Sequence, residues 1–100
     1  MRPRRAHERV KISGFVRLFW EDERGVQHFC QAEAKDVSPS GISVTLRGRL
    51  PLRTVVQVES VKNLVRGAAT VRRCEQRGMN YDVGLEFVGG GRGAAKMKYT

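Results

Sequence analysis

Apolar and polar residues alternate along most of the chain with the period of two that is typical of β-strands. From Val10 to Trp20 the even positions are apolar or glycine, while the odd positions include Lys11, Ser13 and Arg17. Successive side chains of a strand point to opposite faces. The pattern therefore predicts a first strand that directs one face, including Trp20, toward a core; two phenylalanines on its other face predict that part of this face is also covered.

Further segments repeat the signal at short intervals. Alternation predicts strands over 26–34, 42–46, 55–58, 69–74 and 81–87, separated by turn-forming residues at 21–25, 36–41, 47–53 and 77–80. Residues 60–66 fit one helical turn or an extended loop. Six short strands without a convincing helix favour an all-β barrel or sandwich. A closed antiparallel barrel suits so small a chain because it leaves few unpaired edges.

The 100 residues suffice for one hydrophobic core. We expect a basic arm over 1–9, a barrel over 10–88 and a flexible glycine-rich tail over 89–100. The sequence has no apolar run long enough to span a membrane and no signal peptide, and its two cysteines, Cys30 and Cys74, lie far apart. These features predict a reducing cytoplasm and inert, buried thiols.

The net charge of +9 is unevenly distributed. Residues 1–11 carry +4 and residues 47–78 carry +6, whereas residues 12–46 between them carry −2. Such an excess favours an anionic partner, such as a nucleic acid, a nucleotide, an acidic protein or a lipid surface. An arginine-rich soluble surface without a specific ligand fits the charge equally well.

Motifs of common enzyme and metal sites are absent from the sequence. His7 and His28 have no carboxylate or thiol partner nearby in the sequence that would suggest a base. His28 falls on the apolar face of its strand, which predicts a hydrogen-bonded core histidine. We therefore expect no catalytic residue, metal or cofactor, and a binding domain in place of an enzyme.

One candidate site is the arm, where Arg4, Arg5 and Arg9 lie within six positions. A guanidinium group is permanently charged and carries a planar fork of donors. It can bind a phosphate through two hydrogen bonds, donate to O6 and N7 of guanine, or stack on a base. Taken alone, the arginines fit an unspecific basic arm better.

The other candidate is the sequence Asp36-x-Ser38-x-x-Gly41. The Asp36 carboxylate can accept hydrogen bonds from the N1–H and N2–H₂ edge of guanine, and Ser38 can donate or accept beside it. Gly41 permits a positive φ and a close backbone approach. Alone, these residues also fit a capped turn in which Gly41 only supplies its dihedral angles.

In this order, the two segments together resemble the PilZ domain family. The segments Ser40-Gly41-Ile42-Ser43-Val44 and Tyr81-Asp82-Val83-Gly84-Leu85-Glu86-Phe87 also look like the third and last strands of that family. The resemblance covers about residues 4–88. It implies a six-stranded antiparallel β-barrel that binds cyclic-di-GMP, a bacterial second messenger, without turning it over.

The resemblance also implies roles for individual residues. Arg5 and Arg9 match the paired arginines that hold the phosphates and guanines of the ligand, and Asp36, Ser38 and Gly41 match the motif that reads a guanine edge. A basic residue at the position of Arg4 goes with binding an intercalated ligand dimer, which implies two molecules per domain. Arg73 is a further candidate for stacking or phosphate binding. The family's C-terminal helix has little counterpart here.

The charge and the arm predict a disorder-to-order switch, in which the arm orders over bound ligand and presents a new surface to a partner. Two alternatives stay open. A small basic barrel could bind single-stranded nucleic acid, which needs exposed aromatic side chains. The candidates are Phe15, Phe19, Trp20 and Phe29, although alternation places Trp20 inward and this alternative gives no role to Asp36. A PilZ-like domain could also have lost its ligand and act only through protein contacts.

Overall fold

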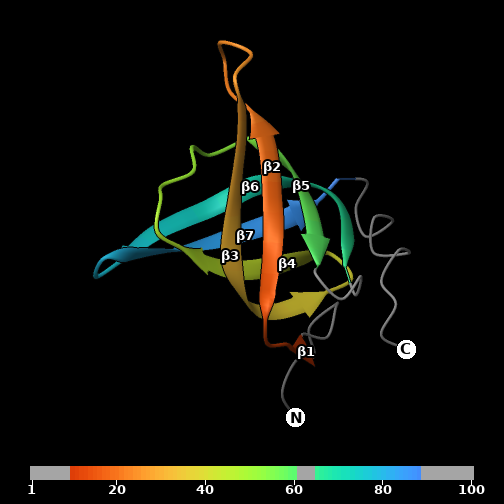
Figure 1. Ribbon diagram of the computed structural model, residues 1–100. Coiled ribbons are helices and arrows are strands. Elements are labelled where there is room, and N and C mark those ends of the chain that lie inside the picture. Colours follow the sequence, from red (N-terminus) through yellow and green to blue (C-terminus); the bar gives the residue numbers. More distant parts are fainter. Residues whose placement is uncertain (1–9, 61–64, 89–100) are drawn as a thin grey trace.

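The computed structural model describes residues 10–60 and 65–88, whose strands form one antiparallel sheet that closes into a barrel (Figure 1). In chain order the strands are β1 (Val10–Lys11), β2 (Phe15–Glu21), β3 (Gln27–Ser38), β4 (Gly41–Leu46), β5 (Val55–Ser60), β6 (Arg66–Arg77) and β7 (Asn80–Phe87). The described residues contain no helix. The predicted all-β fold is thereby confirmed, whereas the predicted arm and tail lie outside the described residues.

The sheet closes into a barrel because β3 pairs with another strand along each of its two edges. The six strands β3, β2, β5, β6, β7 and β4 are neighbours in that order, and β4 pairs back with β3. The predicted first strand is in fact two short ones, β1 and β2, which pair with successive parts of β3. The chain between them contains Gly14, whose φ of +105° is in a region that favours glycine.

The barrel interior holds the hydrophobic core, to which the predicted inward positions contribute. Leu18, Val58 and Leu85, for example, come from three different strands and are at most 3% exposed. Phe87 is the largest of the fully buried side chains. Trp20 is partly buried and packs against the core, as predicted, and Cys30 and Cys74 do the same. The two thiols are half-buried, less than predicted; partial burial raises the pKa of Cys30.

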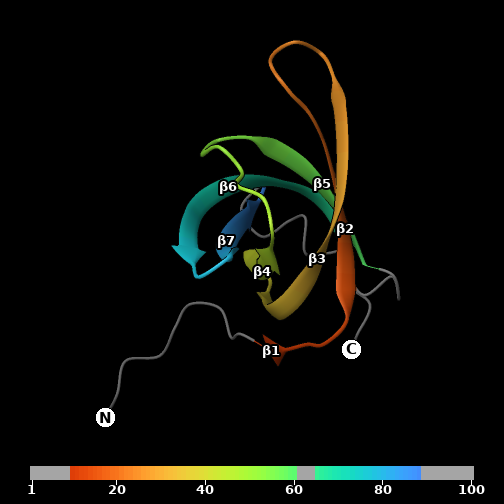
Figure 2. The same cartoon turned by 60° about the vertical axis from the view of Figure 1, so that its left-hand side comes forward.

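The β2–β3 hairpin projects well beyond the barrel (Figures 1 and 2). The prediction of His28 as a core residue is therefore wrong: its side chain is 41% exposed, and its Nε2 lies 2.8 Å from Oδ2 of Asp22. The ring stacks on Trp20 at a centroid distance of 5.3 Å. The hydrogen bond from His28 is the main cause that lowers the pKa of Asp22, which also accepts from the backbone amide of Val26.

Other boundaries also differ from the prediction. The turn predicted over 36–41 is shorter, because β3 continues through Ser38 and β4 begins at Gly41. Strand β6 is longer than the predicted 69–74. Part of the segment 60–66, at 61–64, lies outside the described residues. Phe15, predicted to be covered, is 53% exposed.

Candidate functional site

Two β-bulges break the alternation of the barrel strands. One lies between Ala34 and Asp36 of β3, and the other lies between Val71 and Arg73 of β6. A bulge inserts one extra residue into a strand and shifts the phase of its side chains. Consequently Lys35 and Asp36 both lie on the outer face between buried residues. Arg72 and Arg73 likewise lie on this face, between a buried valine and the half-buried Cys74.

The bulges bring Asp36 and Arg73 into one row across the outer face. Asp36 pairs with Ser43 of β4, Ser43 pairs with Gly84 of β7, and Gly84 pairs with Arg73 of β6. Directly paired residues share a face of the sheet. An acidic and a basic side chain from opposite halves of the chain therefore lie on the same face, at the two ends of a four-residue row.

Gly84 makes room for the arginine in this row. A Cβ atom at Gly84 would lie 3.2 Å from both Nε and Nη2 of Arg73, so the arginine side chain lies close over the β7 backbone. One end of the guanidinium group is 3.5 Å from Oε1 of Glu75. A larger residue at position 84 would push Arg73 away from the sheet.

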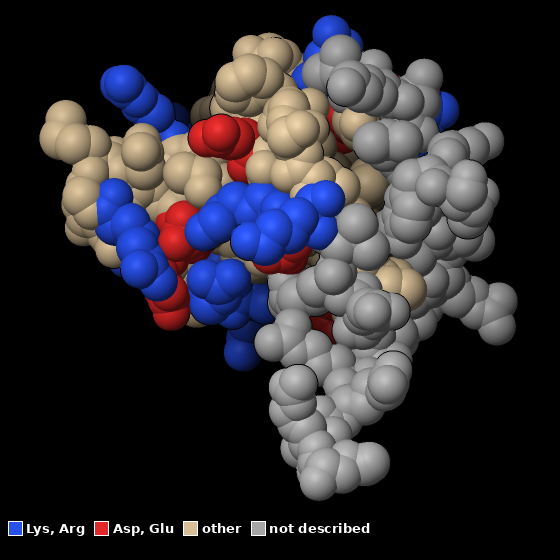
Figure 3. Space-filling model, turned by 90° about the horizontal axis from the view of Figure 1, so that it is seen from below, with Lys and Arg blue, Asp and Glu red and all other residues tan. Residues whose placement is uncertain are grey.

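A surface depression of about 310 Å³ lies beside this row. Its lining includes three of the predicted site residues, Ser38, Gly41 and Arg73. Asp36 is not part of the lining but pairs with Ser43, which is. The predicted Arg4, Arg5 and Arg9 lie outside the described residues. Seen from below the view of Figure 1, Lys and Arg side chains gather on the surface with Asp and Glu between them (Figure 3).

Ser38 and Gly41 have structural roles at the rim of this depression. The Ser38 hydroxyl accepts a hydrogen bond from the amide of Ser40 at 3.2 Å, which fixes the turn between β3 and β4. Gly41 has no positive φ. Glycine is required there because a Cβ atom would lie 2.2 Å from the carbonyl oxygen of Leu85. The positive φ predicted for this glycine is therefore wrong, and the close approach that requires glycine is to the backbone of β7.

Comparison with protein families identifies the fold. The model of the family described as PilZ domain matches residues 3–96. The chain belongs to the PilZ domain family. PilZ domains are binding and adaptor domains that generally bind cyclic-di-GMP. No curated protein matches the chain.

In this PilZ domain a second polar cluster lies next to the first bulge. The side chain of Asp82, only 12% exposed, lies 3.4 Å from Nζ of Lys35 and 3.0 Å from Nε of Arg77. It also accepts a hydrogen bond from the Thr45 hydroxyl at 3.2 Å. Burial raises the pKa of Asp82, but these partners outweigh it and hold the pKa below its usual value. The cluster connects Lys35, the extra residue of the bulge, to three other strands.

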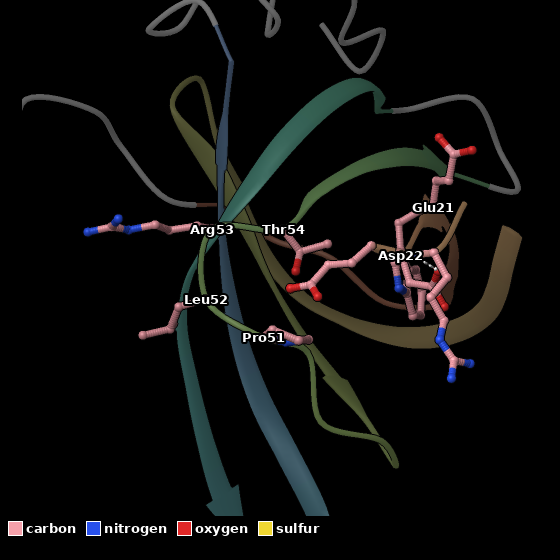
Figure 4. A pocket seen from close by; sticks show the side chains of 9 residues that line it. Glu21, Asp22, Pro51, Leu52, Arg53 and Thr54 are labelled. Atoms are coloured by element: carbon pink, nitrogen blue, oxygen red, sulfur yellow. Dashed lines mark hydrogen bonds between the residues drawn. The ribbon is translucent and has the colours of Figure 1, made fainter. Parts of the chain in front are cut away.

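A larger cavity of about 500 Å³ lies at the other side of the domain, between the β2–β3 hairpin and the turn 51–54 (Figure 4). Its lining includes Glu21, Asp22 and Glu23 but none of the predicted site residues. In the close-up, Arg53 and Leu52 point away from the acidic residues. The three carboxylates outnumber the two arginines of the lining, Arg24 and Arg53, which disfavours an anionic ligand there.

The described ranges 10–60 and 65–88 hold no cluster of three His, Cys, Asp or Glu side chains suited to a metal ion. Within these ranges, no helix has the length and apolar character needed to cross a membrane.

The sequence prediction missed Arg72, Ser40 and Glu86, which also line the depression. One signal could have found Arg72: two adjacent arginines stand between the inward residues Val71 and Cys74, where alternation allows only one outward residue. Glu86 follows from the strand register, which the sequence alone does not provide.

Proposed function

We propose that this PilZ domain is a receptor and adaptor for cyclic-di-GMP in the bacterial cytoplasm. The ligand binds to the outer face of the barrel at Asp36, Ser38, Gly41 and Arg73. The arm over 1–9 closes on it through Arg5 and Arg9, with Arg4 adding a second ligand molecule. The ordered arm then presents a changed surface to an output protein.

The observation that carries this proposal is the pairing of β1 with β3. Val10 pairs with Val37, and Lys11 pairs with Asp36. Arg9 directly precedes Val10 in the chain, and consecutive Cα atoms are about 3.8 Å apart. The arm therefore joins the barrel beside Asp36. Arg5 lies five residues before Val10, within about 17 Å for a fully extended chain.

The chemistry of these groups is complementary to the two sides of a guanine nucleotide. The Asp36 carboxylate can accept hydrogen bonds from the N1–H and N2–H₂ groups of guanine. Arginines donate to its O6 and N7 atoms and to the phosphates. Hydrogen bonds to charged groups contribute about 1.5–3 kcal/mol each, and ordering a backbone residue costs about 1–2 kcal/mol. These terms nearly balance, so the arm is expected to order only with ligand.

Calorimetric titration with cyclic-di-GMP tests the proposal. We expect Arg5→Ala, Arg9→Ala and Asp36→Asn each to weaken binding at least about tenfold, which corresponds to about 1.4 kcal/mol. Arg4→Ala should reduce the stoichiometry from two ligands to one. Arg24→Ala, at the exposed tip of the β2–β3 hairpin, removes the same charge away from the site and should bind normally. Unchanged affinity in both arm variants would refute the mechanism.

Exposed aromatic side chains favour one alternative, the binding of single-stranded nucleic acid. Phe15 and Phe29 are 53% and 59% exposed, and stacking of bases on such rings is common. However, Phe15 pairs with Glu33 on β3, and the next outward residue of β2, Arg17, pairs with Glu59 on β5. These carboxylates oppose a polyanion. Tight oligonucleotide binding with a steep salt dependence would support the alternative over cyclic-di-GMP binding.

A further inference from the structure

An ion pair occupies part of the depression in which we place the ligand. Nε of Arg72 lies 2.5 Å from Oε1 of Glu86, and both residues line the depression together with Arg73. The side chains of Arg72 and Glu86 are 62% and 47% exposed. An anion entering this space therefore meets a guanidinium group that already has a carboxylate partner.

The fold holds both partners at the predicted ligand motif. The bulge in β6 turns Arg72 to the outer face beside Arg73, since Arg73 and not Arg72 pairs with Gly84. Glu86 pairs with Gly41, so its carboxylate arises from β7 next to the first residue of β4. Two guanidinium groups and one carboxylate thus share the lining of the depression with Ser38 and Gly41.

We propose that Arg72 is an additional phosphate-binding residue and that Glu86 is a built-in competitor for it. This inference rests on the proposed function. A phosphate can accept two parallel hydrogen bonds from a guanidinium group, as a carboxylate can. Glu86 is tethered within reach and so competes at a high effective concentration. Exposed ion pairs are weak, and a ligand phosphate can therefore displace the carboxylate from Arg72.

The consequence is a lowered affinity for the messenger. Without Glu86, Arg72 would offer its donors to the phosphate without first breaking an interaction. The carboxylate also repels the dianionic ligand directly. Glu86 therefore helps to set the ligand concentration at which the domain responds, and it does so without being one of the family's motif residues.

Calorimetry with cyclic-di-GMP on the full chain tests this inference with four proteins. We expect Glu86→Gln to bind about two- to fivefold more tightly, which is the range for an exposed ion pair. Arg72→Gln should bind more weakly than the wild type. In the double variant, the gain from Glu86→Gln should be clearly smaller, because the competitor no longer has a guanidinium group to occupy and only its direct repulsion of the ligand is removed.

Glu59→Gln is the matched control. Glu59 also forms an exposed pair with an arginine of β6, at 3.1 Å from Arg66, but neither residue lines the depression. This variant removes the same charge and should keep wild-type affinity. Circular dichroism of each variant checks that the fold is intact.

The outcomes separate the two proposals. If the wild type binds and Glu86→Gln binds equally or more weakly, the competition is refuted while the proposed function stands. If Glu86→Gln gains as much in the Arg72→Gln background, the effect is one of general charge and the role of Arg72 is refuted. If the wild type does not bind cyclic-di-GMP, the proposed function is wrong and this inference falls with it.

Discussion

Replacing Gly41 with alanine would introduce a methyl group against the backbone of β7. The new Cβ atom would lie 2.2 Å from the carbonyl oxygen of Leu85 and 3.4 Å from Cα of Glu86. No side chain can rotate to relieve this clash, because the atoms belong to the paired strand. Next to the paired residues Gly41 and Glu86, the amide of Phe87 donates a 2.8 Å hydrogen bond to the carbonyl of Ser40. The substitution must therefore separate β4 from β7.

Overpacking of this kind costs about 1–3 kcal/mol, and a lost hydrogen bond adds about 0.5–1.5 kcal/mol. We expect the free energy of unfolding to fall by about 2–4 kcal/mol. For a domain of this size, 1 kcal/mol shifts Tm by about 4–8 °C, so Tm should fall by about 8–30 °C. Backbone strain adds nothing, because Gly41 has no positive φ.

Thermal unfolding followed by circular dichroism measures this difference. Gly48→Ala is the control, since a Cβ atom at Gly48 would have no neighbour within 4 Å. Surface changes of that kind usually alter stability by less than about 0.5 kcal/mol. A Gly41→Ala variant that melts within about 3 °C of the control would refute the close approach of β4 and β7.

Two further predictions concern stability. At pH 7, Asp82→Asn should lower the free energy of unfolding by about 1.5–3 kcal/mol, because the amide cannot pair with Lys35 and Arg77. The folded-state pKa of Asp82 lies below 3.8, so this contribution is complete above that pH and is lost as the pH falls below it. If urea unfolding gave the same difference in unfolding free energy between wild type and variant at pH 7 and at about pH 3, this pH dependence would be contradicted. Phe87→Ala should cost about 3–5 kcal/mol in urea unfolding through the cavity it leaves, whereas the exposed Val88→Ala should have little effect; a loss below about 1 kcal/mol for Phe87→Ala would place that side chain outside the core.

The alternation of apolar residues predicts which side chains form the core, because every second side chain of a strand points to the same face of the sheet. Leu18 and Leu85 could be placed inside on this ground alone. The same rule fails for His28, because alternation continues past the rim of the barrel into the projecting hairpin. How far a hairpin extends beyond the core depends on where neighbouring strands end, and β5 pairs with β2 only between Val16 and Phe19.

Three of the predicted site residues, Ser38, Gly41 and Arg73, line the depression, but the geometry of the site could not be predicted from the sequence. The pairing of Asp36 with Ser43 and of Arg73 with Gly84 depends on two bulges. Adjacent charged residues mark both bulges in the sequence, yet their cross-strand partners follow only from the register. Likewise, the requirement for glycine at position 41 comes from the backbone of β7, which is distant in sequence.

The central claim is that the arm closes over ligand bound beside Asp36. Amide hydrogen exchange of residues 1–9, measured with and without saturating cyclic-di-GMP, tests it most directly. We predict that the ligand slows exchange in this segment and that Asp36→Asn removes the protection at the same ligand concentration. Saturation of the wild type by cyclic-di-GMP with no change of exchange in residues 1–9 would contradict the account.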